Sequence, residues 1–109
     1  MGNSSEMLKV LLVCGSGASS GFMAANIRKA AKNRNLNMDI KARGEAEIEN
    51  YIDDIDALLV GPHLAYIMDD INDLTKDNQN VKVILMKSSY YSTLDGDAAL
   101  DDLMSELKI

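Results

Sequence analysis

The chain has 109 residues, of which 47% are hydrophobic, and its formal net charge is −6. This length suits one modest core, so we expect residues 1–109 to form a single domain with a flexible N-terminus over 1–6. The acidity argues against nucleic-acid binding, which depends on Lys and Arg releasing counterions from phosphates. No apolar run approaches the roughly 20 residues of a membrane-spanning helix. We therefore expect a cytoplasmic protein that does not insert into a membrane.

Cysteine and histidine occur once each, as Cys14 and His63. One cysteine cannot form an internal disulfide, which is consistent with a reducing compartment. One Cys and one His cannot build a closed metal site without carboxylates at suitable spacing. We therefore expect no metal and no diffusible cofactor.

From the amino terminus, residues 7–13 form a short apolar run, which is typical of a strand buried on both faces. Residues 20–34 carry apolar side chains at helical spacing, and this pattern breaks at residues 35–37. Residues 37–42 alternate between apolar and polar, which predicts a strand with one face toward solvent. A short helix is expected over 45–52.

Residues 56–60 predict another buried strand, which ends at Gly61-Pro62. From Leu64 to Leu74, apolar residues recur at i, i+3, i+4, i+7 and i+10, as on one face of an amphipathic helix. A fourth strand is expected over 81–86, and a last helix over 97–107.

This alternation of strands and helices predicts an α/β fold, a four-stranded parallel sheet with helices on both faces. The least polar strands, the first and third, should be central, and the alternating second strand should lie at an edge, giving the order 2-1-3-4. In such sheets, ligands bind at the carboxyl ends of the strands where the winding reverses, here between the first and third strands. The loops at that point are 14–21 and 61–64. The predicted crevice therefore contains the single cysteine and the single histidine.

The segment after the first strand combines a thiol with small residues that let the backbone approach an anion. Cys14 is followed, in order, by Gly15, Ser16, Gly17, Ala18, Ser19, Ser20 and Gly21. Glycines let backbone N–H groups converge on an anion, and the helix that follows adds its free N–H groups and positive dipole end. The same field stabilises a thiolate, the nucleophilic form of cysteine. The segment predicts a phosphate-binding loop with Cys14 as its nucleophile.

The same segment also has interpretations other than a phosphate loop. Cys14 can instead be a small buried hydrophobic residue at a strand end, with glycines that serve only a tight turn. The G-x-x-x-x-G-K-[ST] pattern of nucleotide-binding loops is absent. Ser20 stands where a dinucleotide-binding G-x-G-x-x-G motif needs its third glycine, so that class is not expected.

Two stretches carry a resemblance to a known family: Val10 to Cys14 with its Gly/Ser loop, and Val60 to Tyr66, which reads VGPHLAY. They resemble the enzyme IIB component of the lactose/cellobiose class of bacterial sugar phosphotransferase systems, over residues 9–108. The resemblance implies a phosphotransferase that accepts a phosphoryl group from phosphohistidine of a IIA partner. It would carry the group as S-phosphocysteine on Cys14, with residues 15–21 binding the phosphate. It would then deliver the group to a sugar held by a membrane IIC component, which mainly sets the choice of sugar.

The family shares its architecture with low-molecular-weight tyrosine phosphatases, so a phosphatase or arsenate reductase-like enzyme is the alternative function. Those enzymes place an Arg six residues after the cysteine to clamp the phosphate. The matching position here is Ser20, and Arg28 lies two helical turns further on. Their general acid is an aspartate, for which Asp95 is the nearest candidate by position. Without the Arg, charge in the transition state is poorly stabilised, which favours a carrier.

Residues outside the loop are candidates for a surrounding shell: Gly61, Pro62, His63 and Tyr91. For His63, a polar residue at a helix start is the favoured interpretation, ahead of a partner contact. Tyr91 matches by position an aromatic residue in the family's loop that can lie over the site, although packing explains it equally well. Arg28 and Lys29 are candidates for contact with an acidic rim on the IIA partner. We expect the isolated chain to be a monomer.

Overall fold

The computed structural model describes residues 7–13, 18–76 and 81–107. In chain order its elements, with η for a 3-10 helix, are β1 (Leu8–Val13), α1 (Ala18–Asn33), β2 (Met38–Arg43), η1 (Glu45–Glu47), α2 (Ile48–Tyr51), β3 (Ala57–Val60), η2 (Pro62–Ile67), α3 (Met68–Thr75), β4 (Lys82–Leu85), α4 (Ser88–Tyr91) and α5 (Gly96–Leu107). The expected flexible N-terminus, residues 1–6, lies outside the described residues.

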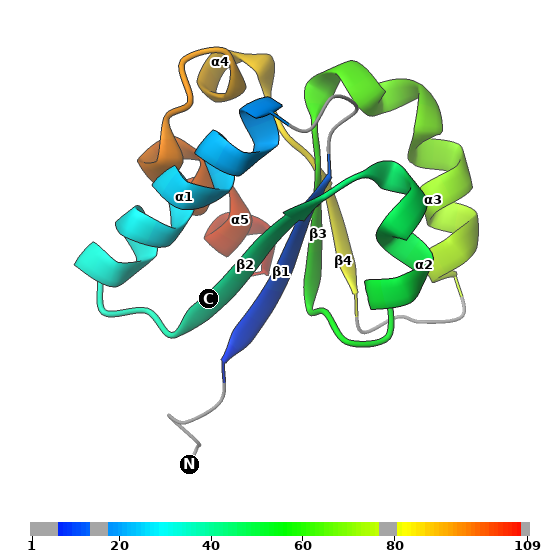
Figure 1. Ribbon diagram of the computed structural model, residues 1–109, viewed down its shortest axis with the longest axis horizontal. Helices are drawn as coiled ribbons and strands as arrows, with labels where there is room; N and C mark the ends of the chain where they lie inside the picture. Colours follow the sequence, from blue (N-terminus) through cyan, green and yellow to red (C-terminus); the bar gives the residue numbers. More distant parts are fainter. Residues whose placement is uncertain (1–6, 14–17, 77–80, 108–109) are drawn as a thin grey trace.

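The four strands form one parallel sheet in the order β2-β1-β3-β4, which confirms the predicted topology. The register brings the last residue of β1, Val13, beside Arg43 of β2 and Val60 of β3. All strands therefore end at the same edge of the sheet, which is the upper edge in Figure 1. The winding reverses between β1 and β3, as expected, so this edge contains the switch point.

Alternate residues of β1 supply two separate apolar cores, one on each face of the sheet. Val10 and Leu12 pack with residues of α1 and α5, whereas Leu11 and Val13 pack with residues of α2 and α3. The two helix layers stand on either side of the sheet in Figure 1. All four of these β1 side chains are almost fully buried, as are the four residues of β3. Burial on both faces explains why these strands read as continuous apolar runs.

The edge strand β2 has two of its carbonyl oxygens covered by arginine side chains. The Asn37 carbonyl accepts from the Leu8 N–H of β1, and carbonyl direction alternates along a strand, so the Ile40 and Ala42 carbonyls point away from β1. The Arg28 guanidinium donates to the Ile40 carbonyl at 2.6 Å, and Arg43 donates to the Ala42 carbonyl at 2.8 Å. Covered carbonyls make an edge strand a poorer template for pairing with another strand.

Some element boundaries differ from the prediction, and one helix was missed. Helix α1 begins at Ala18 rather than near Ser20, and the segment after Pro62 starts as a 3-10 helix before α3. The missed helix is α4, a single turn over 88–91 that begins after the extended residue Lys87. Four residues are too few to show a helical period in the sequence. Within the described part of the chain, no helix has the length and apolar character needed to span a membrane.

Candidate functional site

The carboxyl edge of the sheet is held together at its centre by backbone hydrogen bonds between β1 and the turn after β3. The Gly61 N–H donates to the Val13 carbonyl at 2.9 Å, directly before Cys14 in the chain. The Gly61 carbonyl accepts from the Leu64 N–H at 2.9 Å, and Pro62 opens η2, where its fixed φ and missing N–H are tolerated. The backbone of Gly61 and Pro62 is therefore held beside the end of β1.

Only the second half of the predicted phosphate loop, residues 18–21, lies within the described ranges. Cys14, Gly15, Ser16 and Gly17 lie outside the described residues. Ala18, Ser19, Ser20 and Gly21 belong to the first turn of α1, so the loop between strand and helix is shorter than the sequence suggested. Gly21 is exposed, and a Cβ added there would meet no atom within 4 Å, so no close approach requires a glycine at this position. The phosphate-binding role of these residues stays a prediction.

The structure brings His63 and Tyr91 together, although 27 residues separate them in the sequence. Their ring centroids are 5.9 Å apart, with the planes tilted by 53°. His63 comes from η2 after β3 and is exposed, whereas Tyr91 comes from α4 after β4 and is half-buried. Both elements follow the carboxyl ends of their strands, at the top of Figure 1. The two side chains therefore form an aromatic pair on the edge where the ligand site was predicted.

Helix α4, which carries Tyr91, is anchored to α5 through Tyr90. The Tyr90 hydroxyl donates to Asp102 Oδ2 at 2.6 Å, and Lys87 Nζ lies 3.9 Å from the other oxygen of that carboxylate. Burial, together with this hydrogen bond, raises the pKa of Tyr90 above its ordinary value. Sequence reasoning gave Tyr90 no role of its own. The contact between Tyr90 and Asp102 holds in place the helical turn that contains Tyr91.

Two residues that a phosphatase interpretation would need have structural roles instead. The Arg28 guanidinium is held by the Ile40 carbonyl of β2. Asp95 Oδ1 accepts a hydrogen bond from the Ala98 N–H at 3.1 Å, so Asp95 is the N-cap of α5. These contacts disfavour Arg28 as a phosphate clamp and Asp95 as a general acid.

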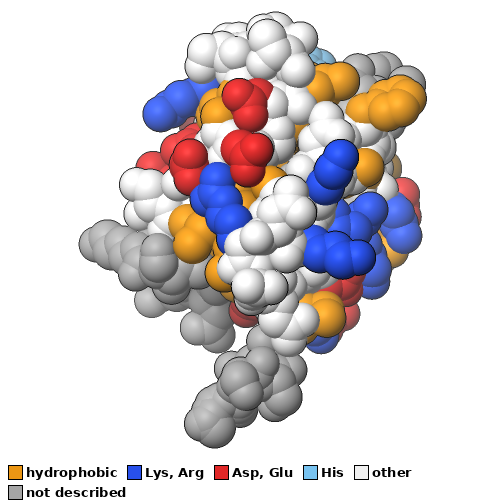
Figure 2. All heavy atoms as spheres, turned by 90° about the vertical axis from the view of Figure 1, so that its left-hand side faces the viewer, with side chains coloured by type: hydrophobic (Ala, Val, Ile, Leu, Met, Phe, Trp, Pro, Cys, Tyr) orange, Lys and Arg blue, Asp and Glu red, His pale blue; other side chains and the backbone are white. Residues whose placement is uncertain are grey.

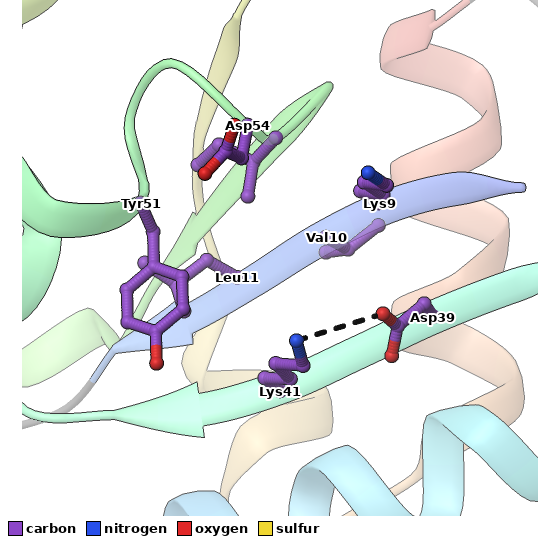
Figure 3. A pocket seen from close by; sticks show the side chains of 8 residues that line it. Lys9, Val10, Leu11, Asp39, Lys41, Tyr51 and Asp54 are labelled. Carbon is purple, nitrogen blue, oxygen red and sulfur yellow. Dashed lines mark ion pairs between the residues drawn. The ribbon is translucent and has the colours of Figure 1, made fainter.

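A cavity of about 310 Å³ lies away from this edge, against the middle of β1 and β2 (Figure 3). Its lining residues are Lys9, Val10, Leu11, Asp39, Lys41, Tyr51, Asp54 and Ile55. Lys41 Nζ lies 3.8 Å from Asp39 Oδ2, the pair marked in the figure. Two lysines and two aspartates balance in charge, so the cavity offers no net attraction to a phosphoryl group. In the described ranges, no cluster of three His, Cys, Asp or Glu residues could hold a metal ion.

The fold and the edge define a class of protein: a small doubly wound α/β domain whose single cysteine and single histidine follow its two central strands in the sequence. Comparison with known families refines this class, because the family model described as "PTS system, Lactose/Cellobiose specific IIB subunit" matches residues 9–102. The chain belongs to this family of phosphotransferase-system subunits. The resemblance stated from the motifs is thereby confirmed.

Individual relatives agree with the family. The oligo-beta-mannoside-specific EIIB component of Bacillus subtilis (strain 168) is 25% identical over 99 residues, which cover 91% of this chain and 95% of that protein. The lactose-specific EIICB component of Lacticaseibacillus casei is 29% identical over 100 residues, or 90% of this chain but only 17% of that protein. Among solved structures, the lactose-specific IIB domain of Streptococcus pneumoniae has the same fold, with a TM-score of 0.83 at 14% identity, covering 93% of this chain and 98% of that one.

Proposed function

We propose that this protein is a phosphocarrier that accepts a phosphoryl group on Cys14 from phosphohistidine of a IIA protein. It then passes the group to a sugar bound in a membrane IIC component. The observation that carries the proposal is the family membership of a chain whose single cysteine directly follows central strand β1, at the switch point of the sheet. Relatives that join the matched segment to a much longer EIICB chain support a partnership with IIC.

The transfer consists of two in-line displacements at phosphorus. In the first, the Cys14 thiolate attacks the phosphoryl group, an S–P bond forms, the P–N bond to the donor imidazole breaks, and that nitrogen keeps the bonding electrons. In the second, a sugar hydroxyl attacks the same phosphorus, loses its proton to a base, and regenerates the thiolate as the S–P bond breaks. Both steps depend on positioning and on electrostatic stabilisation rather than on further covalent chemistry by the protein.

A carrier must keep its phosphoryl group from water between the two steps. Ser20 stands where phosphatases of this architecture have their phosphate-clamping Arg, so hydrolysis would lack its main source of charge stabilisation. The N-terminus of α1 and its preceding glycines would hold the group through backbone N–H donors. We infer that this arrangement stores the phosphoryl group instead of releasing it as phosphate.

The test is phosphorylation by the general phosphotransferase proteins and a IIA protein of the lactose/cellobiose class, followed by intact mass spectrometry. Wild type is expected to gain one phosphoryl group, and Cys14→Ser none that transfers onward to sugar. If Cys14→Ser accepts the group as readily as wild type, the assignment is wrong. Turnover of p-nitrophenyl phosphate or arsenate without any IIA protein would instead identify a phosphatase or a reductase.

A further inference from the structure

Phe22 and Tyr66 are the most exposed of the large hydrophobic side chains in the described part of the protein. Their relative exposures are 66% and 75%, against 45% for Met7, 41% for Leu74 and 38% for Leu85. Single exposed hydrophobic residues are common on protein surfaces, so exposure alone indicates nothing. The positions of these two aromatic residues carry the argument.

Both aromatic residues lie just beyond the carboxyl ends of the two central strands. Phe22 is the fifth residue of α1, which follows β1, and Tyr66 is the fifth residue of η2, which follows β3. The first five residues of an α-helix rise roughly 8 Å, so Phe22 is close to the start of α1. Tyr66 comes five residues after Gly61, whose N–H donates to the carbonyl of Val13 at the end of β1. Helix α1 packs in the core on one face of the sheet, whereas Leu64 and Ile67 of η2 pack in the core on the other face, so the elements that carry Phe22 and Tyr66 lie on opposite sides of the sheet.

We propose that Phe22 and Tyr66 are the two apolar anchors through which the IIA phosphodonor docks, one on each side of the transfer edge. This inference rests on the proposed function and names the docking residues of that same site. A standard protein interface covers about 800 Å² of each partner, roughly 30 Å across. The two longer dimensions of this protein are 35 and 33 Å, so one partner standing on the edge reaches both anchors.

Two separated anchors suit the chemistry that the donor must perform. An in-line displacement requires the donor nitrogen, the phosphorus and the thiolate to be aligned, and a misplacement of about 1 Å is costly. One contact would leave the donor free to tilt, whereas contacts on both sides of the site fix its orientation. Aromatic side chains are well suited to this because they bury a large area and have few rotamers to lose. The partner should therefore present an apolar ring around its phosphohistidine.

The charge on α1 defines a further feature of the partner. Lys29 is exposed and lies seven residues after Phe22, so both side chains project from the same side of the helix. Its neighbour Arg28 is engaged by the Ile40 carbonyl, which leaves Lys29 as the better placed of the two predicted docking cations. Figure 2 faces the side of the molecule that carries α1, and its Lys and Arg side chains gather mostly on the right-hand half. Seven residues rise about 10 Å along an α-helix, so an acidic residue that meets Lys29 would lie about that far from the partner's contact with Phe22, on the side of the partner that faces α1.

The experiment measures the initial rate of Cys14 phosphorylation against the concentration of the phosphorylated IIA protein that serves wild type. Phe22→Ala and Tyr66→Ala are each expected to raise KM about tenfold, the size typical of an interface hot spot, with kcat changed less than twofold. Leu74→Ala and Met7→Ala are matched controls. They also truncate exposed hydrophobic residues, but at the end of α3 and before β1, and their KM should stay within twofold.

The outcomes separate this inference from the proposed function. If Cys14 is phosphorylated normally in Phe22→Ala and Tyr66→Ala, the docking surface is wrong and the phosphocarrier function stands. If these variants accept phosphoryl normally but transfer it poorly to the sugar, the anchors serve the IIC acceptor and the proposal is overturned. If wild type accepts no phosphoryl group from any IIA protein of the class, the proposed function itself is wrong. Thermal melting of each variant checks that the fold is retained.

Discussion

Replacing Gly96 by Ala is expected to destabilise the protein through a backbone collision between two helices. Gly96 is the first residue of α5 and is buried against α1. A Cβ added there would lie 2.4 Å from the carbonyl carbon and oxygen of Asn26 and 2.8 Å from the Ile27 nitrogen. Ordinary contact begins near 3.4 Å, so the helices must separate by roughly 1 Å. Ile27 is fully buried, so α1 cannot shift without disturbing the core.

The size of the effect follows from two opposing terms. Overpacking of this kind typically costs about 1–3 kcal/mol. Ala also lowers the conformational entropy of the unfolded chain, which stabilises the folded protein by about 0.4–1 kcal/mol where the backbone conformation permits. The separation also threatens the hydrogen bond from Asn26 Nδ2 to the Leu94 carbonyl, 2.8 Å long, which joins the same two segments. A net loss of about 1–3 kcal/mol corresponds to a fall in Tm of roughly 5–20 °C for a domain of this size.

The assay is thermal unfolding followed by circular dichroism, with two other glycines as controls. An added Cβ at Gly21 or Gly44 meets no atom within 4 Å. Gly21 lies inside α1, so Gly21→Ala should raise Tm by several degrees, because Ala is favoured over Gly in a helix by about 1 kcal/mol. Gly44→Ala should change Tm little. A Gly96→Ala protein that melts within 2 °C of wild type would show that the close approach of α1 and α5 is not as described.

Three further predictions concern side-chain hydrogen bonds away from the transfer edge. Because the pKa of Tyr90 is raised in the folded protein, the unfolded chain releases this proton first, and wild type loses stability as pH rises above about 10. Tyr90→Phe should remove this loss of stability. Urea unfolding of both proteins between pH 8 and 11 measures the difference. Asp95→Ala should lower stability by about 0.5–2 kcal/mol through loss of the α5 cap, yet leave Cys14 phosphorylation unchanged; a large loss of acceptance would revive a catalytic role. Joint replacement of Arg28 and Arg43 by Ala should promote self-association, because it uncovers two carbonyls of β2. Light scattering would detect this self-association, with Lys29→Ala as the control. If the double variant stays monomeric, the arginines do not have the role of covering the strand edge.

The order of the strands was accessible from the sequence because burial determines composition. A central strand of a parallel sheet is covered on both faces, so 57–60 contains only apolar residues. The edge strand β2 has one face against α1 and another with Asp39 and Lys41, which explains its alternation. Right-handed crossovers then leave few ways to connect four such strands. The edge of the sheet where the site lies followed from the same reasoning.

The start of α1 was less accessible because its first turn contains residues that suit a loop as well as a helix. Ser19, Ser20 and Gly21 have weak helix preference and are common in caps and turns. The apolar period becomes visible only at Met23, which is fully buried. The boundary prediction therefore came two residues late. The earlier start leaves four residues, 14–17, between the end of β1 and the start of α1.

The pairing of His63 with Tyr91 could not be predicted, because it depends on an element that has no signature of its own. The turn over residues 88–91 is held by contacts with other parts of the chain: the Tyr90 hydroxyl donates to Asp102 on α5, and Lys87 lies close to the same carboxylate. An isolated turn of four residues is unstable in water, so tertiary contacts must supply the free energy that holds it. Tyr91 is part of this turn, and its ring lies 5.9 Å from the His63 ring of η2. Residues that surround a site at a sheet edge are therefore positioned by neighbours several elements away, which local sequence patterns do not record.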